Sequence, residues 1–511
     1  MTHPPAPARS RLSGALWLIL ALCIARLWIV PLWSSFWVDE MGTAFVVRYG
    51  ASHPTFAVAP QVPQSIYYWL PRFSQWLCGL SEPAYRIPSV LVMALALWLI
   101  SLAAARLIHP RARWFAVFAA LGLRGIDYHA ADARPYALGI CLAAAGLYSL
   151  VRWLDSGRGS FAAAFILSGA LLWRVQLIYW PFYLVFVIYA AVRLWRRETR
   201  VPPLHALLVF GAVAAALVPV ALSALSLFRQ ASAHVMVVQP SLRATEHLLR
   251  WNLVLICAVG AWLTRQIGKV GRAGAKGAPP ANPGSRAEPA STLLVFSAWL
   301  IQPFALYAFS HLTGDSVFLN RYLSIMLPGI ALAATWAAAR FLAPAQWKPA
   351  ALVLGIGVFA VMGQWTTLWP PHEISDWRAA ARTVNAAIPP AAPVICPSPF
   401  IEARWPIWRP DYPLPGFLYA HLAVYPLRHK VLLFPYESSP EATRYATSLL
   451  PSLTQFPRFA VYGGAGNARY WRNWFAAALA PAGWTNTLRK FGDVYVAIFQ
   501  NPAAQPPPRQ P

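Results

Sequence analysis

The sequence predicts a polytopic α-helical membrane protein with a small C-terminal α/β domain, and three observations support this fold class. Hydrophobic residues make up 58% of the 511 residues and charged residues only 12%, whereas soluble domains usually carry about 25% charged residues. Apolar runs such as 12–31 and 206–227 approach or reach the roughly 20 residues that cross a bilayer. From about Pro370 onward, short apolar runs alternate with polar stretches, as in a soluble domain.

The apolar runs predict about eleven spans. Arg9 and Arg11 precede an apolar run, a pattern that is also typical of a cleavable signal peptide. That run is long, contains three tryptophans and has no small-residue cleavage pattern after it, so it is interpreted as a retained first span. The predicted spans are 12–33, 88–107, 113–124, 136–153, 161–173, 176–192, 204–227, 248–266, 291–310, 322–340 and 350–369.

Basic residues predict the orientation of these spans. Arginine clusters such as 193–200 fall on the same side as the N-terminus, which the positive-inside rule assigns to the cytoplasm. The formal charge of +25 therefore needs no nucleic-acid partner. The predicted parts are a cytoplasmic tail (1–11), a membrane domain (12–369) with an external loop (34–87) and a disordered cytoplasmic loop (268–290), an external α/β domain (370–500) and a disordered tail (501–511). Within the loop, the aromatic-rich stretch 66–80 is predicted to lie in the membrane interface.

Several kinds of chemistry lack their sequence motifs. The chain contains no CxxC, HExxH or Walker A sequence and no credible GxGxxG, so ATP hydrolysis and dinucleotide chemistry have no visible apparatus. Cys78 and Cys396 both lie in predicted external regions. A disulfide between them is open, although nothing in the sequence requires it.

Six acidic residues fall at the same predicted end of the spans, in a chain with only 17 acidic residues against 42 basic ones. They are Asp39, Glu40, Asp127, Asp132, Glu246 and Asp315. Carboxylates beside a membrane are costly and often functional. Asp39 is a candidate general base with Glu40 as its supporting neighbour. The alternative is that Asp39 caps a helix and Glu40 lies in its first turn.

The segment Asp127-Tyr128-His129-Ala130-Ala131-Asp132-Ala133-Arg134-Pro135-Tyr136 carries a second group of candidates. Pro135 suits the first position of a helix, which would place Asp132 and Arg134 at a helix N-terminus. Such a terminus favours a phosphate. The alternative is that Asp132 caps the helix and Arg134 reaches lipid headgroups. His129 and Asp132 are weak candidates for a metal site.

Two further arginines lie at predicted outer ends of helices. Arg321, within Asn320-Arg321-Tyr322, precedes an apolar span, and Arg174 lies in the break between two short spans. A permanently charged guanidinium can neutralise a phosphate near the interface. Anchoring in lipid headgroups is the alternative.

These motifs together resemble the GT-C class of membrane glycosyltransferases, in particular the bacterial branch similar to protein O-mannosyltransferases and to the aminoarabinose transferases that modify lipid A. The family has an Asp-Glu pair in its first external loop, which Asp39-Glu40 match. Its acidic-Ala-Arg-x-Tyr motif resembles residues 132–136, and its Arg-Tyr-Leu resembles residues 321–323. The segment Asp376-Trp377-Arg378, at the start of the external domain, also resembles the family. Departures are Asp132 in place of Glu, Pro135, and the stretch 63–68 in place of His-Pro-Pro-Leu-Tyr-Tyr.

The resemblance implies an inverting transfer of a sugar from a polyprenyl-phosphate donor to a hydroxyl of a glycan, lipid or protein acceptor, on the outer face of the bacterial inner membrane. It implies Asp39, Glu40 and Asp132 as catalytic residues, and Arg134, Arg321 and Arg174 as ligands of the donor phosphate. Tyr67, Tyr68, Tyr136 and Tyr322 are expected to line the substrates. Because such a donor is already activated, neither a nucleotide nor ATP is required, and a divalent metal stays open. The competing function is a transporter, flippase or non-catalytic binder of lipid-linked sugars, although its charges would more naturally lie near the middle of the membrane.

Overall fold

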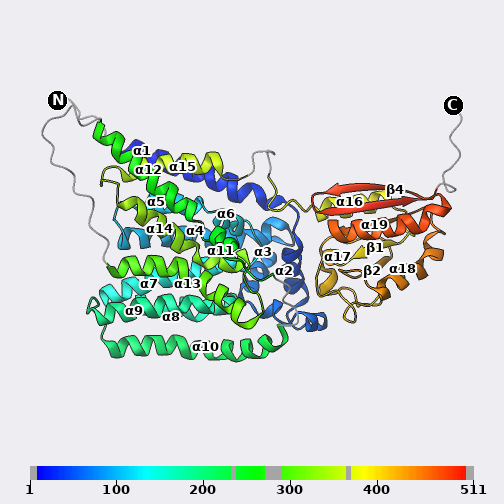
Figure 1. Ribbon diagram of the computed structural model, residues 1–511, viewed down its shortest axis with the longest axis horizontal. Coiled ribbons are helices and arrows are strands. Elements are labelled where there is room, and N and C mark those ends of the chain that lie inside the picture. The colour runs from blue at the N-terminus through cyan, green and yellow to red at the C-terminus, as the bar shows by residue number, and fades with distance from the viewer. Residues whose placement is uncertain (1–7, 232–237, 271–288, 364–369, 502–511) are drawn as a thin grey trace. The chain divides into compact units, whose positions relative to one another are not determined.

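The computed structural model describes residues 8–231, 238–270, 289–363 and 370–501, which form two compact units. The helical unit comprises residues 1–32, 65–70 and 86–370. The C-terminal unit comprises residues 33–64, 71–85 and 371–511. Figure 1 shows the ribbon of both, and each unit is described separately below.

The helical unit contains most of the helices. Its long helices are α1 (Ala8–Ile24), α4 (Glu82–Leu107), α7 (Tyr136–Ser156), α8 (Gly159–Val175), α9 (Tyr183–Trp195), α10 (Pro203–Ala231), α12 (Trp251–Val270), α13 (Pro289–Thr313), α14 (Leu327–Ala339) and α15 (Trp347–Val361). The shorter ones are η1 (Ala25–Ile29), η2 (Val30–Trp33), η5 (Ile66–Tyr68), α5 (Arg113–Leu121), α6 (Arg124–Ala130), η6 (Leu177–Phe182), α11 (Leu242–Leu248) and η8 (Asn320–Met326).

The helical unit is that of a multi-pass membrane protein. Among the described residues, seven helices are long and apolar enough to cross a membrane, and a bent pair would make eight. The seven are Leu12–Trp33, Glu82–Leu107, Tyr136–Ser156, Leu177–Trp195, Pro203–Leu227, Pro289–Thr313 and Asn320–Ala339. The bent pair is Leu242–Leu248 with Trp251–Gln266, at 48°. The predicted fold class is therefore confirmed, although the predicted number of eleven is only approximate.

Three predicted spans correspond to helices of fewer than 18 residues. The span 113–124 corresponds to α5, whose nine residues reach only about 14 Å. Gly159–Val175 and Trp347–Val361 are apolar helices of 17 and 15 residues. The predicted end of the last span, 364–369, lies outside the described residues, as do 1–7, most of the loop 268–290 (271–288) and the tail 502–511.

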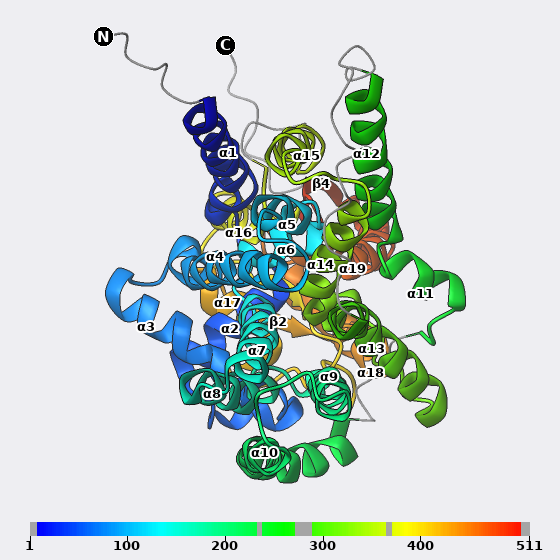
Figure 2. The same cartoon turned by 90° about the vertical axis from the view of Figure 1, so that its left-hand side faces the viewer.

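Packing in the helical unit runs from helix to neighbouring helix. Contacts join α1 to α15, α15 to α5, α5 to α14 and α14 to α13, and continue from α13 through α9, α7 and α8 to α10. Figure 2 views α10 and α15 nearly end-on. The core of this unit is mostly apolar and includes the fully buried Trp28 and Trp299. This bundle fixes the ends of α7, α8 and η8, where the candidate residues lie.

The C-terminal unit joins the first predicted external loop to the α/β domain. Gly42 of α2 packs against Phe417, and the backbone N–H of Phe417 donates to Thr55 Oγ1 at 3.1 Å. The loop contains α2 (Val38–Tyr49), η3 (Pro54–Val58), η4 (Val62–Gln64) and α3 (Trp69–Cys78). On α3, which lies in the stretch 66–80 that is predicted to be interfacial, Trp69, Phe73 and Trp76 are exposed.

The α/β domain is built on a five-stranded sheet in the order β2-β1-β3-β5-β4. The strands β2, β1 and β3 are parallel, whereas β3, β5 and β4 are antiparallel, with Phe459 opposite Phe499. The strands are β1 (Val394–Pro397), β2 (Val431–Phe434), β3 (Arg458–Gly464), β4 (Thr485–Phe491) and β5 (Val494–Gln500). The helices are α16 (Trp377–Ala387), η9 (Phe417–Tyr419), α17 (Ala420–Val424), α18 (Pro440–Leu453), α19 (Ala465–Leu479) and η10 (Ala480–Ala482).

Cys78 and Cys396 do not form a disulfide. All five cysteines are free, Cys78 is exposed on α3, and Cys396 is fully buried in β1. A buried thiol in the central part of the sheet behaves as a small hydrophobic side chain. The disulfide left open by the sequence is therefore absent.

Candidate functional site

Asp39 and Glu40 lie in the first turn of α2, in the C-terminal unit. The helix is capped by Trp37, whose extended backbone ends the preceding loop. The Trp37 N–H donates to Glu40 Oε2 at 3.3 Å, and the Glu40 side chain is fully buried. Asp39 is only partly buried. The alternative that Asp39 caps the helix is wrong, because Trp37 is the cap residue and Glu40 accepts the capping bond.

His372 is a neighbour of Glu40 that the sequence analysis missed. A His372 ring nitrogen and a Glu40 carboxylate oxygen lie within 4.8 Å of one another. The backbone N–H of His372 donates to Ser34 Oγ at 3.0 Å, which links it to the segment before α2. An imidazole and a carboxylate are suitable ligands for a divalent cation. The only indication of His372 in the sequence was its position shortly after the last predicted span.

A polar network holds the segment in front of Asp39 within the C-terminal unit. Arg378 Nη1 lies 3.0 Å from Glu82 Oε1, and its Nη2 donates to the Trp33 carbonyl at 2.8 Å. Tyr425 donates to the same Glu82 oxygen at 2.8 Å and accepts from the Phe36 N–H at 2.8 Å. The Asp-Trp-Arg segment noted in the sequence therefore has a positioning role here: Asp376 caps α16, Trp377 is buried and Arg378 fixes the loop.

In the helical unit, Asp132 lies between α6 and α7 and is fully buried. Its Oδ2 is 3.7 Å from His129 Nδ1, so the two weak candidates for a metal site are close together. The His129 ring is 4.8 Å from that of Tyr136. Because α7 begins at Tyr136 with Pro135 as its cap residue, Asp132 does not cap this helix, and Pro135 lies one position earlier than predicted.

Hydrogen bonds connect Tyr67 to this junction. The hydroxyls of Tyr67 and Ser89 are 3.5 Å apart, and Ser89 Oγ donates to the Asp132 carbonyl at 2.6 Å. Ser65 Oγ donates to the Val175 carbonyl at 2.6 Å, beside Arg174. Tyr67 and Tyr68 are both buried. The predicted aromatic stretch is therefore held against the junction that carries Asp132.

The segment η8 packs against α6, α7 and η6, which brings Arg321 and Tyr322 to the same region. Gln302 fixes it by donating to the carbonyls of Tyr322 at 3.2 Å and Ile178 at 3.0 Å. The Tyr179 hydroxyl lies 2.8 Å from Ser324 Oγ, and it is close enough to Tyr136 and Tyr322 for electrostatic interaction. The structure thus groups two of the predicted substrate-lining tyrosines with a third, Tyr179.

The arginines of the helical unit have different surroundings. Arg134 and Arg321 are half-buried, and the Arg321 guanidinium lies 5.6 Å from the centre of the Tyr322 ring. Arg174 donates to the Ala216 carbonyl of α10 at 3.0 Å, close to Pro219, which lies inside that helix. In a membrane such carbonyls need an internal donor, so Arg174 braces α10.

A fully buried arginine, Arg86, was missed by the sequence analysis. Its Nη1 donates to the carbonyls of Leu32 at 3.0 Å and Pro31 at 3.2 Å, at the end of the first span. The short interruption Tyr85-Arg86-Ile87-Pro88 in an apolar run was its only signal.

Asp127 is buried beside the first span. The Trp28 indole N–H donates to Asp127 Oδ1 at 3.2 Å. Burial raises the pKa of Asp127 well above its usual value, and the Trp28 hydrogen bond opposes this only in part. The other two acidic residues of the predicted group, Glu246 and Asp315, are exposed and half-buried.

Comparison with known proteins identifies the fold. No protein-family model matches the sequence, and no curated protein matches it. The crystal structure of ArnT from Cupriavidus metallidurans in the apo state is 15% identical, with a TM-score of 0.55 over 95% of this chain and 98% of that one. The structure of the same protein bound to undecaprenyl phosphate is 14% identical, with a TM-score of 0.54 over 96% and 99%. The chain therefore has the fold of these ArnT structures.

Proposed function

Because the whole chain has an ArnT-like GT-C fold, we propose that it is a glycosyltransferase that uses a polyprenyl-phosphate sugar as donor. The main support is that the fold likeness extends over nearly the full length of both chains. The solved ArnT binds undecaprenyl phosphate. We propose the same donor class here, in the bacterial inner membrane, with a hydroxyl of a cell-envelope glycan, lipid or protein as acceptor on the outer face.

The proposed reaction is a direct displacement at the anomeric carbon. The acceptor oxygen attacks this carbon while Asp39 takes the hydroxyl proton. The bond between the carbon and the phosphate oxygen breaks, its electron pair stays on the phosphate, and the configuration inverts. Asp39 suits the base because it is partly accessible, whereas Glu40 is buried and holds the helix N-terminus.

Fixed positive groups are required for the leaving phosphate. Arg134 and Arg321 are the proposed ligands, because the segments that carry them pack together in the helical unit. Tyr136 and Tyr322 border the same region and are proposed to line the donor. Arg174 is the weakest of the proposed phosphate ligands, since it already donates to the α10 backbone.

We propose that the acidic groups bind a divalent cation. Glu40 and His372 offer two ligand atoms in the C-terminal unit, and Asp132 with His129 offer two in the helical unit. A bound cation would add positive charge to that of the arginines. Titration of the purified protein with Mn²⁺ tests this, because unchanged Mn²⁺ affinity in Glu40→Gln or Asp132→Asn would remove that residue from the site.

The decisive experiment measures sugar transfer by the Asp39→Asn protein, purified in lipid nanodiscs with a polyprenyl-phosphate sugar. Turnover is expected to fall by about 10² to 10⁴, because the amide cannot take a proton, while donor binding stays intact. Asp411→Asn, an exposed carboxylate of the same unit, is the matched control. Near wild-type turnover in Asp39→Asn would reject the assignment and make Asp132 the first candidate. Glu40→Gln should harm turnover less, or affect folding instead.

A transporter of lipid-linked sugars is the competing function. The described charged groups of the helical unit gather at helix ends such as the α6–α7 junction and η8. Transporters more often place theirs on broken helices near the middle of the membrane. Movement of labelled lipid between the two leaflets, without formation of a new glycosidic bond, would favour the transporter.

A further inference from the structure

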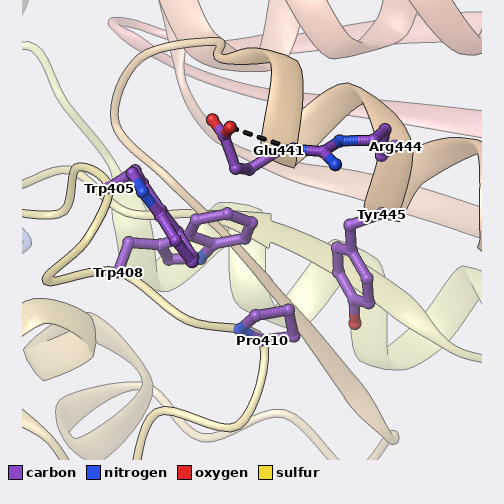
Figure 3. Close-up of a pocket in the computed structure, with 6 residues that line it drawn as sticks. All are labelled: Trp405, Trp408, Pro410, Glu441, Arg444 and Tyr445. Carbon is purple, nitrogen blue, oxygen red and sulfur yellow. Dashed lines mark hydrogen bonds and ion pairs between the residues drawn. The ribbon is translucent and has the colours of Figure 1, made fainter.

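The C-terminal unit carries an open pocket that takes no part in the proposed transfer. Its volume is about 300 Å³, and it lies between the segment 405–410 and the first turns of α18. Six residues line it: Trp405, Trp408, Pro410, Glu441, Arg444 and Tyr445. Figure 3 shows Trp405 and Trp408 on one side of the pocket, Tyr445 on the other, and Glu441 with Arg444 above them in this view.

The aromatic part of the pocket combines a fixed wall with an accessible ring. Trp408 is only 1% exposed, and its indole N–H donates to the Leu433 carbonyl at 3.3 Å. Its ring centre lies 6.1 Å from that of Tyr445. Trp405, by contrast, is 53% exposed. Together, the accessible ring of Trp405 and the buried ring of Trp408 form the aromatic lining of the pocket.

The polar part of the pocket supplies one acceptor and one donor side by side. Arg444 Nη2 lies 3.0 Å from Glu441 Oε1, on the first turn of α18 and the next. A sugar hydroxyl can donate to the carboxylate and accept from the guanidinium at the same time. A phosphate would be repelled by Glu441, and an alkyl chain would gain nothing from either group.

We infer that this pocket binds a neutral pyranose ring of a glycan. The C–H groups on one face of a pyranose carry partial positive charge, and they are attracted to the electron-rich face of an indole. The volume lies at the small end of the roughly 300–1,000 Å³ of ligand sites, which suits a single ring better than a lipid tail. This binding is separate from the proposed transfer and uses none of the residues proposed for it.

Saturation-transfer NMR on the full chain in nanodiscs tests the inference, with a panel of methyl hexopyranosides and pentopyranosides as probes. Saturation is expected on the C–H protons of one ring face of at least one probe. Trp405→Ala should weaken its binding by about three- to tenfold, and Glu441→Gln by about tenfold. Trp405→Phe, which keeps a ring face, should restore part of the affinity. Tyr470→Ala is the matched control, because Tyr470 is a 43% exposed aromatic residue of the same unit outside the pocket.

Two results would overturn the inference. One is the absence of saturation transfer to every pyranoside, or equal transfer in Trp405→Ala and Tyr470→Ala. The other is binding of a proline-rich peptide or of lipid vesicles that depends on Trp405 while no pyranoside binds. Failure here is distinguishable from failure of the proposed transferase, because Asp39→Asn should abolish transfer and leave pyranoside binding unchanged.

Discussion

Asp39 and Glu40 are adjacent and carry the same charge, but their environments differ. Glu40 is buried and accepts a backbone N–H, so its carboxylate supports the helix N-terminus. Asp39 has a partly accessible side chain on the same turn. The pair therefore divides into a structural group and a group that can exchange a proton with a substrate.

The arginines Arg134 and Arg321 give a prediction about donor binding. Changing either to Ala is expected to weaken use of the lipid-phosphate donor by about ten- to a hundredfold, because a lost charged hydrogen bond costs roughly 1.5–3 kcal/mol. Lys should rescue only in part, since it lacks the planar fork. The measurement is the dependence of the transfer rate on donor concentration. Arg243→Ala, a change at an exposed arginine between α10 and α12, is the control. If donor use equals wild type in both Arg134→Ala and Arg321→Ala, these two arginines only anchor the protein in lipid headgroups.

His421 gives a prediction about pH. It is fully buried in the C-terminal unit, with its ring centre 5.0 Å from Trp377, and neither ring nitrogen has a hydrogen-bond partner among the described residues. Burial lowers its pKa from 6.5 to about 3. The unfolded state therefore binds a proton between these values while the folded state does not. Stability should fall as the pH decreases from about 6.5 towards 3, by up to about 5 kcal/mol.

The buried thiol of Cys396 can report this loss locally. In a Cys78→Ser background, modification of Cys396 by a dithiodipyridine reagent should accelerate in wild type as the pH falls from 6.5 to 4. His421→Phe should show a flatter dependence, because its side chain cannot be protonated. Equal rates of the two proteins at pH 7.5 would show that the substitution is tolerated. Parallel pH dependences of the two proteins would contradict the prediction.

Among the helices, the close packing of α13 against α14 depends on Gly329, which has no side chain. A Cβ on Gly329 would lie 2.5 Å from the backbone of Ala298 and Trp299. Neither backbone can move without separating the two helices, whose contact helps to hold η8 in place. Element packing therefore determines where Arg321 and Tyr322 lie.

We expect Gly329→Ala to destabilise the helical unit by at least about 1–3 kcal/mol, the usual cost of overpacking. Gly357→Ala on α15 is the matched control, because no atom lies within 4 Å of its added Cβ. The measurement is the apparent unfolding temperature of each purified variant in the same detergent. A Gly329→Ala protein as stable as the Gly357→Ala protein would show that the helices can separate without cost.

At the scale of the whole molecule, the assignment of the two units to sides of the membrane stays a prediction. Residues 34–87 and 370–500 are predicted to be external and 268–290 cytoplasmic, from the asymmetry of Lys and Arg. In a Cys78→Ser background, an impermeant maleimide should label Ala51→Cys and Ser448→Cys in intact cells, whereas Ser285→Cys should react only after permeabilisation. Labelling of Ser285→Cys from outside would reverse the orientation and with it the proposed side of the reaction.

Much of the architecture could be predicted from local sequence. Burial in lipid requires a contiguous apolar run, so most long spans were predicted within a few residues. Three of the five strands, β2, β3 and β5, contain the short apolar runs 431–433, 459–461 and 494–499, whereas β1 and β4 were not predicted. β1 is only four residues long, and β4 is an exposed edge strand with polar residues such as Arg489 and Lys490.

The surroundings of the candidate residues could not be predicted in this way. His372 lies beside Glu40, and Ser89 joins Tyr67 to the Asp132 backbone, although these residues are far apart in the sequence. The loop 33–64 groups with the C-terminal unit through contacts between residues that are also far apart in the sequence. The apolar segments and the charged motifs can be recognised in the sequence, because apolarity and charge are properties of contiguous residues. Which charged groups are buried, capped or brought together is visible only in the folded chain, because this depends on packing between distant segments.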